Sequence, residues 1–137
     1  MIKMPVIVAG ISARQRRRMV MEKVTMVINE GPGSLKSWNA LRLAAALLGE
    51  KLKVYIFLLD DGTFIAKGGQ KPVAGLSELN LAKKLEELIG MGAEVQACGV
   101  CATARGLEDK ELVAGIPIVS MVDLARAIKN STRVIVF

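Results

Sequence analysis

Two cysteines are the residues of this sequence whose type and spacing can most directly do chemistry. Cys98 and Cys101 form a CxxC pair in the run ACGVCATARGL, with Arg105 shortly after them. The thiolate is the reactive form of cysteine, and free backbone N–H groups at a helical turn or a nearby cation lower a thiol pKa. The run therefore predicts a nucleophilic thiol at Cys98, a helical turn beginning near Cys101 or Ala102, and Arg105 as a candidate electrostatic helper.

Other interpretations of the same spacing stay open. Both cysteines can be small buried side chains, because cysteine is among the most buried residue types. A thioredoxin-like dithiol also uses CxxC at a strand-to-helix turn, although Ala97 stands where thioredoxins usually have Trp. A four-cysteine zinc site would need two subunits, since the chain has two cysteines and no histidine. The lack of histidine also excludes Ser-His-Asp and Cys-His nucleophile pairs.

Two further segments are similar to binding or catalytic motifs. The segment 31–37, GPGSLKS, matches neither GxxxxGK[ST] nor GxGxxG, so a capped turn is favoured over a nucleotide site. Asp60 and Asp61 are candidate acid/base carboxylates, but adjacent carboxylates point to different sides of an extended chain, which favours a turn.

Length and charge indicate one domain with a basic extension. The chain has 137 residues, 52% of them hydrophobic, which is enough for one core. Of 19 basic residues, five lie in residues 1–20, where there is no acid, so 14 basic and 13 acidic residues remain. We expect a basic extension over 1–20, either upstream of a true start near Met21 or a nucleic-acid or membrane-surface arm, and a domain over 21–137. The basic residues of the extension are Lys3, Arg14, Arg16, Arg17 and Arg18.

The remaining chain is nearly neutral, so nucleic-acid binding is not expected except through that arm. No apolar stretch approaches the roughly 18 to 20 residues that span a bilayer. The N-terminal apolar run precedes the basic cluster, the reverse of the order in a secretory signal. Two cysteines without such a signal indicate a reducing compartment, so a cytoplasmic location is expected.

The elements that must position the cysteines alternate along the chain. Strands are expected at 24–28, 53–59, 94–97, 117–119 and 132–137. Helices are expected at 34–49, at 81–89, briefly at 108–113, and after a capping box of Ser120 and Asp123. This order predicts an α/β fold, a three-layer α/β/α sandwich with a mostly parallel five-stranded sheet. Cys98 then follows the third strand, at the sheet edge where reacting groups collect.

The sequence resembles the DsrE/DsrF-like family, which includes YchN-like and TusD-like sulfur-relay proteins. The resemblance lies in the cysteine run with the short helix and weak GIPIVSM strand after it, the opening VTMVINEG segment and the Asp60-Asp61-Gly62 turn. The resemblance covers about Met21 to Phe137. It implies a DsrEFH-like fold, assembly as a trimer or hexamer, and a sulfur carrier that accepts and passes sulfane sulfur as a persulfide. In TusD-like members the active cysteine stands eight residues before the glycine of an Arg-Gly pair, as Cys98 stands before Gly106.

The resemblance further implies sulfur donor and acceptor proteins as partners and no cofactor. Cys101 is not part of the TusD-like pattern; it is either a resolving residue, which would form a disulfide with Cys98 as sulfide leaves, or a side chain that fills space. Not all members of the family transfer sulfur, so activity as a sulfurtransferase stays open. Two alternatives also stay open: a CxxC dithiol redox protein and a non-catalytic homo-oligomeric binding protein. Residues 63–72, within a glycine-rich loop, are either a gate that keeps water from the sulfur or a plain surface loop.

Overall fold

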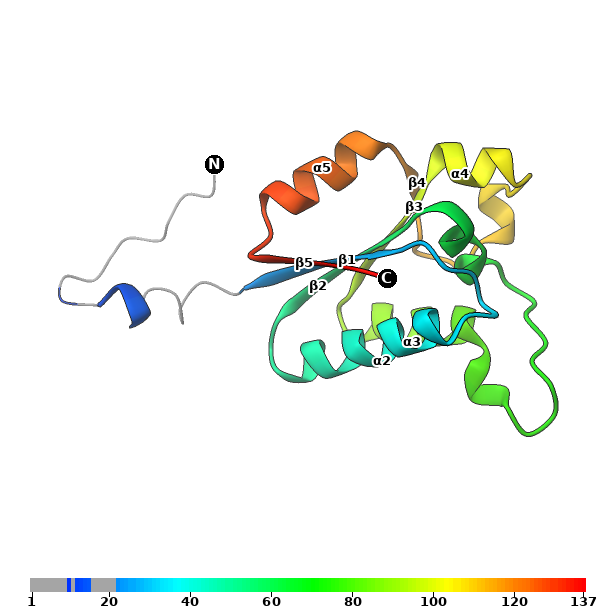
Figure 1. Ribbon diagram of the computed structural model, residues 1–137, viewed down its shortest axis with the longest axis horizontal. Coiled ribbons are helices and arrows are strands. Elements are labelled where there is room, and N and C mark those ends of the chain that lie inside the picture. The colour runs from blue at the N-terminus through cyan, green and yellow to red at the C-terminus, as the bar shows by residue number, and fades with distance from the viewer. Residues whose placement is uncertain (1–9, 11, 16–21) are drawn as a thin grey trace.

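The computed structural model describes residue 10, residues 12–15 and residues 22–137, so the predicted extension over 1–20 lies almost wholly outside the described residues. The described chain forms one sheet of five strands (Figure 1). All four strand pairings are parallel and the order is β4-β3-β2-β1-β5, which confirms the predicted α/β class. The strands are β1 (Lys23–Ile28), β2 (Lys53–Leu58), β3 (Glu94–Cys98), β4 (Ile118–Val119) and β5 (Arg133–Val136).

Helices cover both faces of the sheet, giving the predicted three layers (Figure 1). Helices α2 (Leu35–Gly49) and α3 (Leu81–Gly90) lie on one face. Helices α4 (Gly99–Ala104) and α5 (Met121–Lys129) lie on the other. Three 3-10 turns connect these elements, namely η1 (Asp60–Ala66), η2 (Ser77–Leu79) and η3 (Asp109–Glu111). Within the described residues, no helix has the length and apolar character that crossing a membrane requires.

Burial and capping explain why these segments fold as they do. The two central strands β1 and β2 are buried from their second residue onward, as expected of parallel strands covered on both faces. Ser34 caps α2 by accepting from the Lys36 N–H at 3.2 Å, and Asn80 caps α3 by accepting from the Lys83 N–H at 3.1 Å. The predicted capping box of α5 is present, because the Ser120 N–H donates to the Asp123 carboxylate at 3.0 Å.

Two boundaries differ from the sequence-based prediction. The turn after β3 begins at Gly99 and not near Cys101 or Ala102, because the sulfur of Cys98 takes the place of an N-cap oxygen. The short helix expected over 108–113 is only the single turn η3. An isolated antiparallel bridge between Lys67 and Leu112 holds this segment extended after that turn.

Residues 63–72, predicted to lie within a glycine-rich loop, are divided between core and surface. Thr63, Ile65 and Ala66 are fully buried, so the beginning of the segment belongs to the hydrophobic core. The Gln70 side chain then donates to the Ile65 carbonyl at 2.9 Å and accepts from the Leu81 N–H at 3.1 Å. These contacts tie the chain to the start of α3. They favour a packed connection over a gate for residues 63–70.

Candidate functional site

Cys98 ends β3 and caps α4 with its own sulfur. Its backbone is extended, and its Sγ accepts a hydrogen bond from the Cys101 N–H at 3.5 Å. The residue is only 4% exposed and packs among the apolar side chains between the sheet and α5. Gly99 allows the chain to turn directly from the strand, because an added Cβ there would lie 3.3 Å from the Val119 carbonyl oxygen on β4. The sulfur therefore sits at the carboxyl edge of the sheet, as predicted.

Cys101 is the more accessible thiol and is chemically different from Cys98. Both cysteines are free, and Cys101 is half-buried. Burial raises the pKa of the Cys101 thiol, and so does its hydrogen bond with Cys98. The backbone of Asp60 and the charge of Arg105 act in the opposite direction on this pKa but do not offset the rise. Cys101 therefore keeps its proton in the reduced pair, and the sulfur of Cys98 is an acceptor of hydrogen bonds.

Arg105 follows α4 and binds the turn after β2. Its Nε donates to Oδ1 of Asp61 at 2.9 Å, and its Nη2 lies 2.8 Å from the same oxygen and also contacts Oδ1 of Asp60. Its Nη1 donates to the Cys101 carbonyl at 3.2 Å. Hydrogen bonding to Asp61 raises the pKa of the Arg105 guanidinium, and the two carboxylate charges add to this. Arg105 is thus held by carboxylates and by the backbone of the cysteine turn.

The expectation that the adjacent carboxylates of Asp60 and Asp61 point to different sides is wrong. Both reach the same guanidinium, because the chain here is a 3-10 turn and Asp60 has a left-handed backbone with φ of 54°. Gly62 locks the turn against β1. Its N–H donates to the Asn29 carbonyl at 3.1 Å, and a Cβ on it would lie 2.0 Å from the Ile28 carbonyl oxygen. The sequence signal that was missed is the complementary charge of Arg105, far away in the chain.

The segment 31–37 is a capped turn, as predicted. The Ser34 N–H donates to the Gly31 carbonyl at 3.1 Å, and the buried Ser37 hydroxyl donates to the Glu30 carbonyl at 2.6 Å. Gly31 lies beside Asp61, since an added Cβ would be 3.7 Å from the Asp61 Cβ. Among the described residues, no group of three His, Cys, Asp or Glu side chains is arranged to hold a metal ion.

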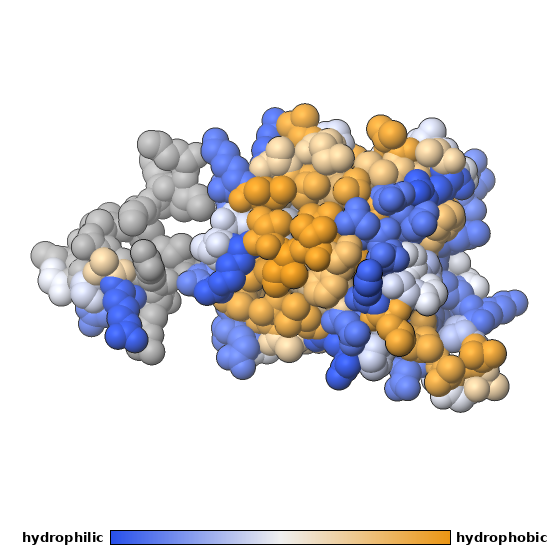
Figure 2. Space-filling view, in the orientation of Figure 1, coloured by the Kyte–Doolittle hydropathy of each residue, from blue (hydrophilic) through white to orange (hydrophobic). Residues whose placement is uncertain are grey.

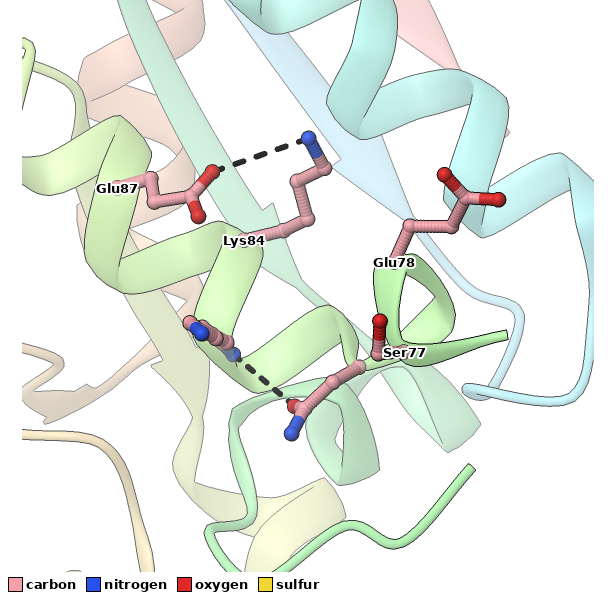
Figure 3. Close-up of a pocket in the computed structure, with 6 residues that line it drawn as sticks. Ser77, Glu78, Lys84 and Glu87 are labelled. Carbon is pink, nitrogen blue, oxygen red and sulfur yellow. Dashed lines mark hydrogen bonds and ion pairs between the residues drawn. The ribbon is translucent and has the colours of Figure 1, made fainter. Parts of the chain in front are cut away.

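A surface pocket elsewhere has no connection to the cysteines. It lies around η2 and the start of α3, on the face of the sheet opposite α4 and α5 (Figures 1 and 3). Its charged side chains neutralise one another, as in the ion pair of Lys84 with Glu87 at 3.7 Å (Figure 3). The cysteine pair is therefore the place in the described chain where reactive groups converge.

Comparison with known proteins identifies relatives over nearly the same residues. The DsrE/DsrF-like family matches residues 22–137. An uncharacterized protein of Methanopyrus kandleri is 43% identical over 115 residues, covering 83% of this chain and 93% of that protein. The protein YchN of Escherichia coli is 33% identical over 120 residues, covering 85% of this chain and all of YchN. The crystal structure of YchN superposes with a TM-score of 0.78, with the same two coverages.

Proposed function

This chain belongs to the DsrE/DsrF-like family, and on that premise we propose that it is a sulfur carrier that accepts and passes sulfane sulfur as a persulfide on Cys98. The observation that carries the proposal is the position of the Cys98 sulfur, which caps α4 at the carboxyl edge of the sheet and accepts the Cys101 N–H at 3.5 Å. This N–H fixes the sulfur at the start of the cysteine turn, beside the exposed residues that a partner can contact.

The transfer conserves atoms and electrons without a cofactor. The Cys98 thiolate attacks the outer sulfur of a donor persulfide, R–S–SH. A new S–S bond forms to Cys98, the old S–S bond breaks, and R–S⁻ leaves with the electron pair. The same reaction in the other direction passes the outer sulfur to an acceptor thiolate. The donor and acceptor are expected to be partner proteins, and the exposed Val100 between the two cysteines is a natural contact for them.

Cys101 is the candidate resolving residue. A Cys101 thiolate can attack the inner sulfur of the Cys98 persulfide, which forms a Cys98–Cys101 disulfide and releases HS⁻. Thiol–disulfide exchange depends on the fraction of thiolate, and burial raises the pKa of Cys101. The protonated Cys101 therefore favours survival of the persulfide at neutral pH, which supports the carrier over the redox alternative.

A dithiol redox protein remains the second candidate. The observation that favours it is the CxxC arrangement itself, with Cys98 at the N-cap and Cys101 in the first turn of α4. This function needs both cysteines and a stable disulfide between them. In that case loss of either thiol abolishes turnover, whereas the carrier needs Cys98 alone.

We further propose that the protein assembles with copies of itself, as a trimer or hexamer. Apolar side chains gather on the surface where β5 lies between α5 and α2 (Figures 1 and 2). Val136 is 64% exposed, and contiguous apolar surface of this kind commonly marks an interface. The exposed apolar residues of these elements are Met121, Val122 and Ile128 on α5 and Val134 and Val136 on β5. Light scattering after gel filtration measures the mass that tests this proposal.

The assignments of domain and location follow the same proposal. The family match begins at residue 22 and β1 at Lys23, which supports treating residues 21–137 as the domain and 1–20 as an extension. A carrier with two free thiols suits a reducing compartment, so we propose a cytoplasmic location.

Intact-protein mass spectrometry tests the function directly. The protein and its Cys98→Ser and Cys101→Ser variants are incubated with a sulfane-sulfur donor and measured before and after reduction. The carrier predicts a reducible gain of one sulfur atom that Cys98→Ser abolishes and Cys101→Ser retains. A loss of two hydrogens that needs both cysteines supports the dithiol protein, and no modification under either condition contradicts both.

A further inference from the structure

Asp60, Asp61 and Arg105 form a charged group beside the cysteine pair, here called the mouth cluster. Its two carboxylates are bound by one guanidinium, so the cluster has a net negative charge. The Asp60 and Asp61 side chains are 64% and 63% exposed, whereas the Arg105 side chain is 21% exposed. The positive charge therefore lies beneath two carboxylates, and the solvent-facing side of the cluster is anionic.

The mouth cluster is in direct contact with the reactive turn. Arg105 Nη1 donates to the Cys101 carbonyl at 3.2 Å, and the backbone of Asp60 acts to lower the pKa of the Cys101 thiol. The neighbouring ion pair on the same rim, Lys36 with Glu30 at 3.6 Å, is neutral as a pair and does not offset the cluster. Two exposed carboxylates therefore lie one guanidinium away from the turn that carries both cysteines.

We infer that Asp60 and Asp61 are specificity-determining residues, which disfavour anionic sulfur donors and favour uncharged or positively charged ones. The inference rests on the proposed function, because it concerns the donor for the Cys98 persulfide. Alone, Arg105 would attract an anion. Its charge does act on the Cys101 thiol, but the two carboxylates paired with it are more exposed and outnumber it, so the solvent-facing side of the cluster disfavours an approaching anion. A like charge near a site lowers the local concentration of an approaching ion and its rate of attack. For a dianion we expect a disadvantage of about three- to tenfold at low salt.

The chemistry of the two donor classes differs only in the leaving group. With thiosulfate, the Cys98 thiolate attacks the outer sulfur, the S–S bond of the donor breaks, and sulfite leaves with the electron pair. With cysteamine persulfide, the same attack releases the cysteamine thiolate, whose ammonium group carries a positive charge. The persulfide formed on Cys98 is the same in both cases. Because the intrinsic reactivity of each leaving group is constant, the change of the rate ratio between the wild type and a variant measures selection by charge.

Alkylation provides a test that does not depend on sulfur transfer. Iodoacetate is an anion and iodoacetamide is uncharged, but both react with the same thiolate, so the ratio of their rates cancels the thiolate fraction. The chain has only two cysteines, both in this site, so the first alkylation seen by mass spectrometry reports on it. Each ratio is divided by that of N-acetylcysteinamide, a small uncharged thiol.

We expect a normalised iodoacetate-to-iodoacetamide rate ratio below one for the wild-type protein. The ratio should rise several-fold in Asp60→Asn/Asp61→Asn. The difference between the two proteins should be smaller at high salt. The matched control Glu78→Gln/Glu86→Gln removes the same charge from η2 and α3, on the other side of the sheet, and should leave the ratio unchanged. A wild-type ratio near one, or no rise in the aspartate variant, overturns the inference.

The sulfur donors form the second arm of the test. The aspartate variant should accelerate loading from thiosulfate relative to loading from cysteamine persulfide. The factor should exceed the change in the alkylation ratio, because the two donors differ by more than one unit of charge and the two alkylating agents by one. If neither donor loads Cys98 but the alkylation ratios behave as expected, the proposed function fails and the charge selection stands. If both donors load and the ratio of their rates does not change, the charge selection fails alone.

Discussion

Arg105 and Asp61 join two segments that are far apart in the sequence, with the Arg105 Nε 2.9 Å and its Nη2 2.8 Å from the same carboxylate oxygen. Arg105 ends the turn that carries both cysteines, and Asp61 belongs to the turn that follows β2. Two charge-assisted contacts from one guanidinium restrict its orientation as well as its distance. The pairing therefore positions the cysteine turn against its neighbour and takes the guanidinium away from the role of a free cation at Cys98.

The first prediction concerns this pairing. Arg105→Met should loosen α4, because it removes the contacts to both aspartates and to the Cys101 carbonyl. Cys98 is 4% exposed in the wild-type protein. The expected result is that iodoacetamide alkylates Cys98 faster in the variant than in the wild type at the same pH. Peptide mapping by mass spectrometry measures the rate at each cysteine. Arg126→Met, at an exposed position of α5, serves as the control, and equal rates in both variants would contradict a positioning role.

The second prediction concerns Gly62. Gly62→Ala should strongly destabilise the fold, because the new Cβ would lie 2.0 Å from the Ile28 carbonyl oxygen, a backbone atom that cannot move without disturbing β1. Overpacking of this severity costs about 3 kcal/mol or more in the free energy of unfolding. Urea denaturation followed by circular dichroism measures the loss. Gly33→Ala has open space around it and should change stability little, so similar losses in both variants would show that the contact is not limiting.

Much of the fold could be predicted from the sequence, and less of the site. The alternation of apolar runs with helical periods predicted the parallel sheet, and Ser120 with Asp123 predicted the start of α5, because these signals are local. The interpretation of Asp60 and Asp61 as an ordinary turn missed their common partner. Arg105 lies more than forty residues away, and neither a spacing nor a periodicity links them. The left-handed backbone of Asp60 could not be predicted either, because aspartate adopts this conformation only occasionally.

The third prediction concerns Tyr55, the single tyrosine of the chain. Its hydroxyl donates to Gln96 Oε1, and burial first, then the charges of Asp123 and Glu94, raise its pKa from 10.0 to about 12. The unfolded state thus loses this proton at lower pH than the folded state. Stability from this group is complete below pH 10.0 and falls as the pH rises to about 12.

A pKa shift of this size corresponds to a loss of about 3 kcal/mol in the free energy of unfolding once the pH exceeds the pKa of Tyr55 in both the unfolded and the folded state. Ultraviolet absorbance of the tyrosinate in the folded protein measures the pKa, and urea denaturation across this range measures the stability. Tyr55→Phe removes the titrating group, so its stability should change less over the same range. A tyrosinate that appears in the folded protein near pH 10.0 would contradict the prediction.

The fourth prediction concerns the lifetime of the persulfide and separates the carrier from the redox protein. Burial and the hydrogen bond with Cys98 raise the pKa of Cys101 above its ordinary value of 9.0, so Cys101 is protonated at neutral pH. Resolution of the persulfide needs the Cys101 thiolate. The rate of sulfide release from loaded protein should therefore be low at neutral pH and rise about tenfold per pH unit until the pH passes the Cys101 pKa.

The measurement follows sulfide release and the mass of the protein at several pH values after the donor has been removed. Cys101→Ser retains Cys98 and cannot form the disulfide, so its persulfide should persist where the wild-type persulfide decays. Identical decay in the two proteins would remove Cys101 from the reaction. Rapid release at neutral pH from the wild type alone would show that Cys101 ionises there, and the pair would then act as a dithiol in place of a carrier.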